Sequence, residues 1–425
     1  MNHRQESDPM NLEKYSLGVG DRFGRQGAAQ LRALQLAKSQ GVHIAPVWNK
    51  SYREHSIIGT RPEDARIAAD KAVRECRWGD RYYVDADHIG MKTVDMFLPS
   101  SNFFTLDVTD FIGKPADSSS LESFVQSLKS FRGSLRIPGL LAPINVSEED
   151  IVCVAKNYLL AMQEAGKIYR HIVQAKDPGK CVIEVSTDEA SRSQTPTELF
   201  FILAAVAHEK IPIQTVAPKF GGKFLKGIDY VGSIDQFQQE FEQDLCVIAH
   251  AIRTFGLPAN LKLSVHSGSD KFSLYPVIHR LIRKHDAGLH LKTAGTTWLE
   301  ELIGLTRSGD KGYAIAQSVY ALAYARIDEL CKPYESVIEI DRSQLPKPHV
   351  VLGWSRDDFI SALRHNGVDP KYNKHLRQLL HLAYKIAAEL GNDYTDMLEC
   401  SREDIAASVT ENLFERHIKP LFLGT

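Results

Sequence analysis

The stretch "RYYVDADHIG" (residues 81–90) begins as a buried β-strand does and ends in charge. Two tyrosines and a valine open it, and these are side chains that strands favour. Asp85, Asp87 and His88 then place three ionisable groups within four residues. A packed core does not select such groups, whereas the carboxyl ends of strands in an α/β barrel carry the functional site. The stretch therefore predicts a strand whose tip takes part in chemistry.

Seven other segments show the same pattern of a short apolar strand followed by a polar tip. They are residues 15–23, 43–48, 103–109, 181–186, 213–220, 261–268 and 289–295. Amphipathic helical runs lie between most of them: one ends at Gly41, one begins at Pro62, and one begins with the capping pair Ser233 and Gln236. Eight strands alternating with helices predict an α/β protein with a (β/α)₈, TIM-like barrel. A doubly wound open sheet is the second interpretation.

Two regions depart from this alternation. About 70 residues separate the fourth and fifth strands, and we expect a helical insertion at about 110–178. Beyond residue 305 the chain is helix-rich, with weak strand signals only at 336–340 and 349–354. We therefore predict a barrel catalytic domain over 1–305 and a mainly helical C-terminal extension over 306–425 that packs on it.

Composition narrows the class of protein. The 425 residues are 43% hydrophobic and 24% charged, with a net charge of −2, so we expect neither nucleic acid nor an anionic membrane as partner. The first 15 residues lack the apolar core of a signal peptide, and no run of 18 apolar residues follows. The six cysteines are far apart, which predicts reduced thiols and a cytoplasmic location. Whether the chain forms a homo-oligomer is left open.

Strand alternation selects the candidate site. Side chains along a strand point alternately to its two faces, and in three later strands the aliphatic residues occupy one face. This leaves Glu184, His266, His290 and Lys292 on the other face, which we expect to be the barrel interior. Buried groups of this kind must neutralise one another or bind something.

A metal site is the more specific interpretation. His88, His266 and His290, each from a different strand, are predicted to hold Zn²⁺, Mn²⁺, Ni²⁺ or Co²⁺ with positions left for substrate. Asp87 and His88 are neighbours, so both reach the site only if the chain turns there, for which Ile89–Gly90 offers the place.

Longer motifs then resemble one known family. They are "VDADHIGMKTVD" (84–95), "VIEVSTDEA" (182–190), "TVAPKFGGKFLKGIDYVG" (215–232), "SVHSGSDKFSLYPVI" (264–278) and "HLKTAGTTWLEEL" (290–302). Together they resemble the tagaturonate epimerase family over essentially the whole chain. The resemblance implies a metal-dependent barrel enzyme, an isomerase that interconverts D-tagaturonate and D-fructuronate at C4. Asp87–His88 and His266 are also similar to the base and ligands of class II aldolases.

The chemistry of C4 epimerisation assigns roles. The C4 proton of a 2-ketose is not acidified by the carbonyl, so retro-aldol cleavage of C3–C4 is expected, with Asp87 as proton acceptor and Glu184 as proton donor. The substrate carboxylate needs a cation, for which the candidates are Lys219, Lys292, Lys271 and Arg22, whereas Lys223 and Lys226 are expected at the surface.

Transient oxidation is the other route, and it needs a dinucleotide. No GxGxxG motif follows a strand, and the nearest cluster, "GVGDRFGRQG" (18–27), has the wrong spacing, so no dinucleotide cofactor is expected. Two alternatives stay open: a metal-dependent isomerase or aldolase acting on a neutral ketose, and a non-catalytic barrel that binds sugar acids.

Overall fold

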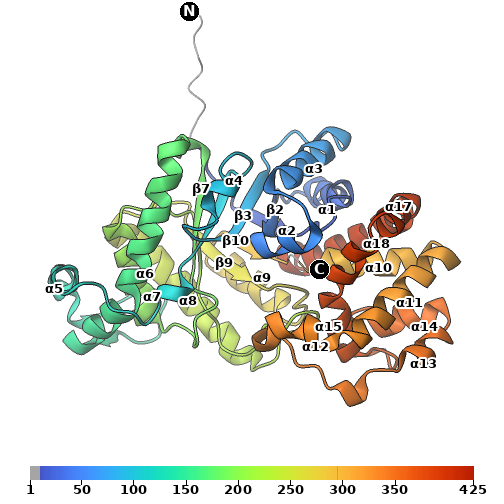
Figure 1. Ribbon diagram of the computed structural model, residues 1–425. Helices are drawn as coiled ribbons and strands as arrows, with labels where there is room; N and C mark the ends of the chain where they lie inside the picture. The colour runs from blue at the N-terminus through green and yellow to red at the C-terminus, as the bar shows by residue number, and fades with distance from the viewer. Residues whose placement is uncertain (1–9, 294) are drawn as a thin grey trace, which may run out of the picture.

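The computed structural model describes residues 10–293 and 295–425, and it contains a closed barrel of eight parallel strands (Figure 1). The strands are β1 (Tyr15–Val19), β2 (Ala45–Ser51), β3 (Tyr83–Ile89), β4 (Phe103–Asp107), β7 (Val182–Ser186), β8 (Thr215–Ala217), β9 (Lys262–His266) and β10 (Leu289–Lys292). They follow one another around the barrel in chain order, and β10 pairs with β1 to close it. All eight predicted strands and the TIM-like fold are confirmed. The described residues do not include residues 1–9, which belong to the segment considered above as a signal peptide. They also do not include residue 294, which belongs to the last predicted strand segment and to the last motif.

Helices surround the barrel. They are α1 (Gly27–Ser39), α2 (Tyr52–Ile58), α3 (Pro62–Glu75), α4 (Val94–Phe97), α6 (Glu148–Ala175), α7 (Pro196–His208), α8 (Ile234–Phe255), α9 (Tyr275–Lys284) and α10 (Thr296–Arg307). The predicted helix ends are found: Gly41, just beyond α1, has φ +86°, and Pro62 is the first residue of α3. The hydroxyl of Ser233 caps α8 by accepting from the Gln236 N–H, but the Gln236 side chain bonds Glu240 instead of returning to the cap.

The insertion between β4 and β7 is mostly helical, as expected, and also holds a small hairpin. Its elements before α6 are η1 (Thr109–Phe111), α5 (Ser118–Ser127), η2 (Lys129–Phe131), β5 (Gly133–Leu135) and β6 (Ile144–Val146), and η3 (Pro178–Lys180) follows α6. β5 and β6 pair antiparallel. The long helix α6 packs on α7 and stands at one side of the barrel (Figure 1).

The C-terminal extension is helical throughout its regular structure. It contains α11 (Asp310–Ala325), α12 (Ile327–Cys331), η4 (Lys332–Val337), η5 (Arg342–Gln344), α13 (Pro348–Leu352), α14 (Arg356–Leu363), α15 (Lys374–Leu382), α16 (Tyr384–Glu389), α17 (Asn392–Cys400), α18 (Arg402–Glu411) and the π-helical η6 (Asn412–Leu423). The two weak strand signals were wrong, because residues 336–340 leave η4 as irregular chain and 349–354 fall largely in α13.

The end of the extension completes the outer helical layer. η6 packs between α9 and α1, while α10 is buried beneath α18, α11 and α14. The rings of Tyr15 and Phe422 lie 5.1 Å apart, and His279 Nδ1 lies 3.0 Å from the Leu421 carbonyl oxygen. The extension thus supplies η6 as the element of the outer layer between α9 and α1. The division into two domains at residue 305 stays a prediction.

The barrel interior is apolar at one end and charged at the other. Its apolar layer consists of Leu12, Ala45, Val47, Tyr83, Phe103 and Val182. Lys262 closes this end by donating to the Leu12 carbonyl (3.0 Å) and to that of Glu13. The opposite end, where the strands finish, is therefore the end of the barrel at which ionisable side chains are concentrated.

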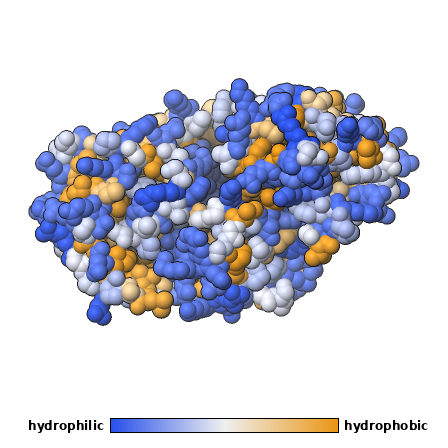
Figure 2. All heavy atoms as spheres, turned by 90° about the horizontal axis from the view of Figure 1, so that it is seen from below, coloured by the Kyte–Doolittle hydropathy of each residue, from blue (hydrophilic) through white to orange (hydrophobic). Residues whose placement is uncertain are grey.

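The molecular surface is mixed. On the face that Figure 2 shows, hydrophobic residues form separate groups divided by hydrophilic ones. Within residues 10–293 and 295–425, no helix combines the length and the apolar character needed to cross a membrane.

Candidate active site

Lys292 stands at the centre of a buried charge cluster at the carboxyl ends of the strands. Its ammonium lies 2.8 Å from Asp85, 2.9 Å from Asp87 and 3.1 Å from Glu184. Thr105 donates to Glu184 (3.1 Å) and also contacts the Asp85 carboxylate and the Lys292 ammonium. The alternation argument is correct for these strands: Glu184 and Lys292 both point into the barrel.

The contacts within the cluster determine which of its groups are ionised. Burial opposes the charged form of Lys292, but its three carboxylate neighbours outweigh burial and hold its pKa well above the ordinary value. Burial also opposes ionisation of Glu184, yet Lys292 and His266 bring the pKa of Glu184 well below its ordinary value. For Asp85 burial prevails over Lys292 and raises the pKa to about 6. A permanently charged Lys292 is a poor Schiff-base nucleophile.

His88 reaches the interior through a break in β3. Its φ is +52°, in the left-handed region that non-glycine residues rarely adopt, and the pairing of β3 with β4 shifts register between Ala86 and Ile89. The expected end of the strand before Ile89–Gly90 is not found, because β3 continues to Ile89, and an irregularity at His88 within the strand takes the place of the turn. Such a backbone conformation is typical of functional sites.

Two imidazoles and a carboxylate converge at this edge. One potential ligand atom each from His88, Asp188 and His266 lie within 4.8 Å of one another. His266 Nε2 lies 2.8 Å from Glu184 Oε1, and its Nδ1 lies 3.1 Å from Asp188 Oδ2. The Nδ1 atoms of both histidines and Glu184 Oε2 are buried without a hydrogen bond. Unsatisfied atoms of this kind are costly unless a ligand completes them.

The charges around the two imidazoles favour their protonated forms. Burial lowers the pKa of each ring, but Asp87, Asp107 and Asp188 raise that of His88 to about 10. Asp188 and Glu184 likewise outweigh burial at His266 and raise its pKa to about 9. These negative surroundings would also favour a divalent cation, which would have to displace the protons from the same nitrogen atoms.

His290 lies one layer deeper. Its Nδ1 lies 2.8 Å from the Ser16 hydroxyl, and its ring packs 5.2 Å from that of Phe103 in the apolar layer. Burial lowers its pKa to about 3, so it is neutral. The structure thus brings His88 and His266 together as predicted, places His290 outside their group, and puts Asp188 in the third position.

Three of the four predicted carboxylate-binding cations are already engaged. Lys292 has the three carboxylates described above. Lys271 is fully buried, its ammonium meeting Leu225 and Ser269 oxygens at 3.0–3.3 Å, and burial lowers its pKa to about 7. Arg22 pairs with Glu54 (3.1 Å) and lies 3.9 Å from the Tyr384 ring. Lys219 is half-buried just beyond β8, and its backbone N–H donates to Gln194.

Comparison with known proteins identifies the family. The model of a family described as tagaturonate epimerase matches residues 4–420. The chain belongs to this family. A relative from Thermotoga maritima, a tagaturonate/fructuronate epimerase, is 27% identical over 381 residues, which cover 87% of this chain and 72% of the relative. Family and relative place the chain among epimerases, a class of isomerases.

Solved structures confirm the fold. A glycerol-complexed crystal structure of fructuronate-tagaturonate epimerase from Cohnella laeviribosi superposes with a TM-score of 0.80 at 23% identity, covering 97% of this chain and 82% of that one. The native crystal structure of the same enzyme gives a TM-score of 0.77, again at 23% identity, with the same coverage of both chains. The tagaturonate epimerase fold therefore includes the barrel and the C-terminal extension.

Sequence reasoning missed several members of this buried cluster. Asp85, Asp107 and Asp188 are all ionisable groups at the strand tips but were given no role, and Asp107 and Asp188 lie at or beyond strand ends, where alternation gives no direction. Thr105 carries no charge and so gave no signal. The one available sign was position: Asp188 follows Glu184 by four residues in the motif "VIEVSTDEA".

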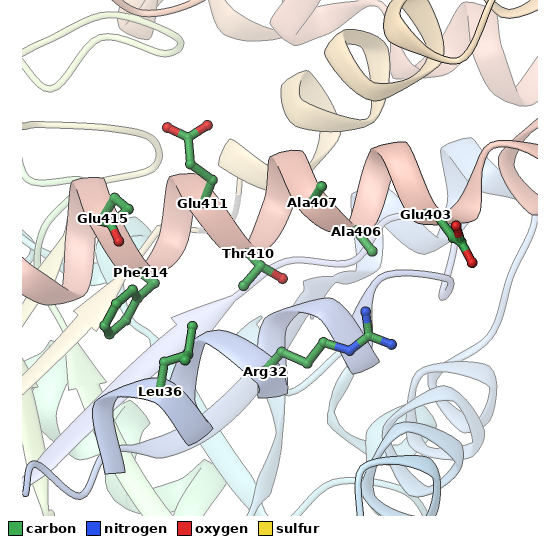
Figure 3. A pocket seen from close by; sticks show the side chains of 9 residues that line it. All are labelled: Arg32, Leu36, Glu403, Ala406, Ala407, Thr410, Glu411, Phe414 and Glu415. Atoms are coloured by element: carbon green, nitrogen blue, oxygen red, sulfur yellow. The ribbon is translucent and has the colours of Figure 1, made fainter. Parts of the chain in front are cut away.

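A separate cavity of about 570 Å³ lies on the outside of the epimerase barrel. Figure 3 shows it between α1, which contributes Arg32 and Leu36, and the α18–η6 segment, which contributes Glu403, Thr410 and Phe414. Its lining combines apolar side chains with scattered charges. Because its two walls belong to the outer helical layer, it is not the site at the strand ends.

Proposed function

We propose that the protein interconverts D-tagaturonate and D-fructuronate by epimerisation at C4, with a divalent metal ion held by His88, Asp188 and His266. The family match over residues 4–420 is the observation that carries the reaction. The convergence of three potential ligands beside a buried carboxylate–lysine cluster supports the location.

The residues fit a metal ion. Two imidazoles and a carboxylate suit Zn²⁺, Mn²⁺, Ni²⁺ or Co²⁺, and buried Nδ1 atoms without hydrogen bonds are available on both rings. Glu184, 2.8 Å from His266 Nε2, orients that ring as carboxylates commonly orient metal-binding histidines. When bound, the ion supplies Lewis acidity that stabilises negative charge on substrate oxygens.

Asp87 is the proposed proton acceptor. Its side chain is 12% exposed, whereas those of Asp85 and Glu184 are fully buried, so Asp87 is the member of the cluster nearest to an entering substrate. Burial opposes its ionisation, but Lys292 and His88 lower its pKa below the ordinary value. As a carboxylate it can take the proton of the C4 hydroxyl while C3–C4 breaks, giving an aldehyde and an enediolate.

Glu184 is the proposed second proton site. The Lys292 ammonium lies 2.9 Å from Asp87 Oδ1 and 3.1 Å from Glu184 Oε1. It can therefore release a proton toward one carboxylate as it receives one from the other. After the aldehyde rotates, C3–C4 re-forms and the new C4 oxygen regains a proton. The roles of Asp87 and Glu184 exchange when the opposite epimer is the substrate.

The test is direct. Purified protein is incubated with D-fructuronate and each of the four ions in turn, and the mixture is followed by NMR. D-tagaturonate should accumulate to an equilibrium mixture, and a chelator should stop its formation. Absence of tagaturonate with every ion contradicts the reaction, and undiminished turnover after complete metal removal contradicts the metal.

A further inference from the structure

The loop after β8 carries a cation that the described residues leave without a partner. Lys226 is half-buried, and between residues 10 and 425, with 294 outside the description, its ammonium forms neither an ion pair nor a hydrogen bond. The neighbouring Lys223, by contrast, is exposed and pairs with Glu339. The expectation that both lysines are surface residues therefore holds for Lys223, whereas Lys226 is half-buried.

Lys226 lies beside the loop that leaves the active site. A Cβ placed on Gly268 would come 3.9 Å from Lys226 Nζ. Gly268 is two residues beyond His266, and its N–H donates to the Lys292 carbonyl at 3.3 Å. The ammonium is thus next to a segment that joins two members of the site, but it is separate from the carboxylate cluster.

The surroundings of Lys226 favour an anion. Burial and Arg22 lower its pKa, and Arg53 adds a third positive charge, against the two carboxylates of Glu54 and Glu189. Arg22 is held by Glu54 and Arg53 is exposed, so Lys226 is the half-buried cation of this group that forms no ion pair among the described residues. A bound carboxylate would relieve the repulsion and accept hydrogen bonds from the Lys226 ammonium.

The C-terminal extension supplies the wall behind the ammonium. Lys226 Nζ lies 5.7 Å from the centre of the Tyr334 ring, and the Tyr334 hydroxyl lies 2.8 Å from that of Tyr384. The Tyr384 ring in turn packs 3.9 Å from Arg22. Two linked tyrosines therefore restrict the side chains of both cations, which lowers the entropy lost when Lys226 binds a ligand.

We infer that Lys226 binds the carboxylate of the substrate and so selects uronates over neutral ketoses. This rests on the proposed function, because a keto-uronate carries its ketone near one end and its carboxylate at the other. The reacting end would then face Asp87 and the His88–His266 pair, and the carboxylate would reach toward the extension. Lys226 takes the role that Lys219, Lys292, Lys271 and Arg22 were expected to fill.

The experiment compares Lys226→Met and Lys226→Arg with the control Lys223→Met, after thermal melts show that all are folded. Two readouts are measured: KM and kcat for D-fructuronate, and binding of inert D-gluconate and of D-glucitol, which lacks the carboxylate. Lys226→Met should raise the KM and weaken gluconate binding by about 10- to 100-fold, the range of a charge-assisted hydrogen bond. Glucitol binding and the control should change less than twofold, and the arginine variant should recover part of the loss.

Two results would overturn the inference: a KM within twofold of wild type in Lys226→Met, or equal weakening of gluconate and glucitol. Failure of the proposed function has a different signature. In that case the wild-type protein converts no fructuronate, and gluconate binding alone decides whether Lys226 forms a carboxylate site.

Discussion

Two buried charge clusters lie close together in the chain, one around His266 at the end of β9 and one around Asp270 just beyond it. Only the cluster around Asp270 has all its charged groups paired. Asp270 accepts from Thr296 (2.6 Å) and Arg377 (2.6 Å), lies 3.2 Å from His365, and so satisfies both oxygens with partners from α10 and the extension. The cluster around His266 instead leaves the Nδ1 atoms of two histidines and one Glu184 oxygen without hydrogen bonds. Complete pairing indicates a role in stability, and incomplete pairing is what the proposed metal site requires of its ligand atoms.

Removing His266 should have the largest effect on activity. His266→Ala takes away one of the three proposed ligands and the contact with Glu184, so turnover of fructuronate should fall by ~10³-fold or more and metal should be lost on dialysis. Elemental analysis measures the metal per chain. His290→Asn is the matched control and should keep its metal, since His290 lies in the layer below. Equal loss in both variants would return His290 to the ligand set in place of Asp188.

Removing Arg377 should chiefly affect stability. Arg377 is fully buried and also donates to the Gly227 and Leu363 carbonyls, so Arg377→Met leaves the buried Asp270 carboxylate without its arginine counter-charge. Unfolding in urea should show a loss of about 3–5 kcal/mol, with metal content unchanged in the folded protein. The exposed pair of Arg342 and Asp328 provides the control, and Arg342→Met should leave stability nearly unchanged. Loss of metal without loss of stability in Arg377→Met would contradict the assignment of the Asp270 cluster to stability.

Asp87→Asn tests the base with the shape of the side chain preserved. An amide cannot accept the C4 hydroxyl proton, so kcat should fall by ~10²-fold while metal stays bound. Initial rates by NMR and metal analysis on the same sample measure both quantities. Turnover close to wild type would show that Asp87 serves only as a counter-charge to Lys292.

Glu301 is a buried carboxyl group that belongs to neither cluster, and its substitution should have the smallest effect. It lies in α10, accepts from Tyr394 (3.2 Å), and burial raises its pKa to about 8. Since the folded protein holds this proton more tightly than the unfolded chain, the stability it contributes is present below pH ~4.5 and is lost as pH rises through ~8. Glu301→Gln should therefore gain about 2 kcal/mol on the wild type between pH 6 and pH 8 in urea titrations. Parallel pH profiles would contradict this.

The sequence predicted the barrel because its signals are local. Eight apolar strands with polar tips can be found without knowing what they contact, and alternation placed Glu184, His266 and Lys292 correctly. The outer layer could not be predicted in the same way. The packing of η6 between α9 and α1 joins residues far apart in the chain, such as Tyr15 and Phe422, and neither carries a sign of its partner.

The site was predicted in part for the same reason. His88 departs from alternation because of its left-handed backbone, and Asp188 lies beyond a strand end, so neither position follows from periodicity. The depth of a residue inside the barrel cannot be read from the sequence either. His290 and His266 share a face but lie at different depths, because in the register of β10 and β9 His290 pairs with Ser264 and Lys292 pairs with His266. Lys226 and Lys223 differ only in tertiary surroundings.

The most direct test uses D-fructuronate carrying deuterium at C4 in ordinary water. Retro-aldol epimerisation at the cluster of Asp87, Glu184 and Lys292 breaks C3–C4 and leaves the C4–hydrogen bond intact. The account predicts tagaturonate that retains the full label, with no nicotinamide absorbance released when the protein is denatured. Loss of the label to water, or no tagaturonate at all from the metal-loaded protein, would contradict it.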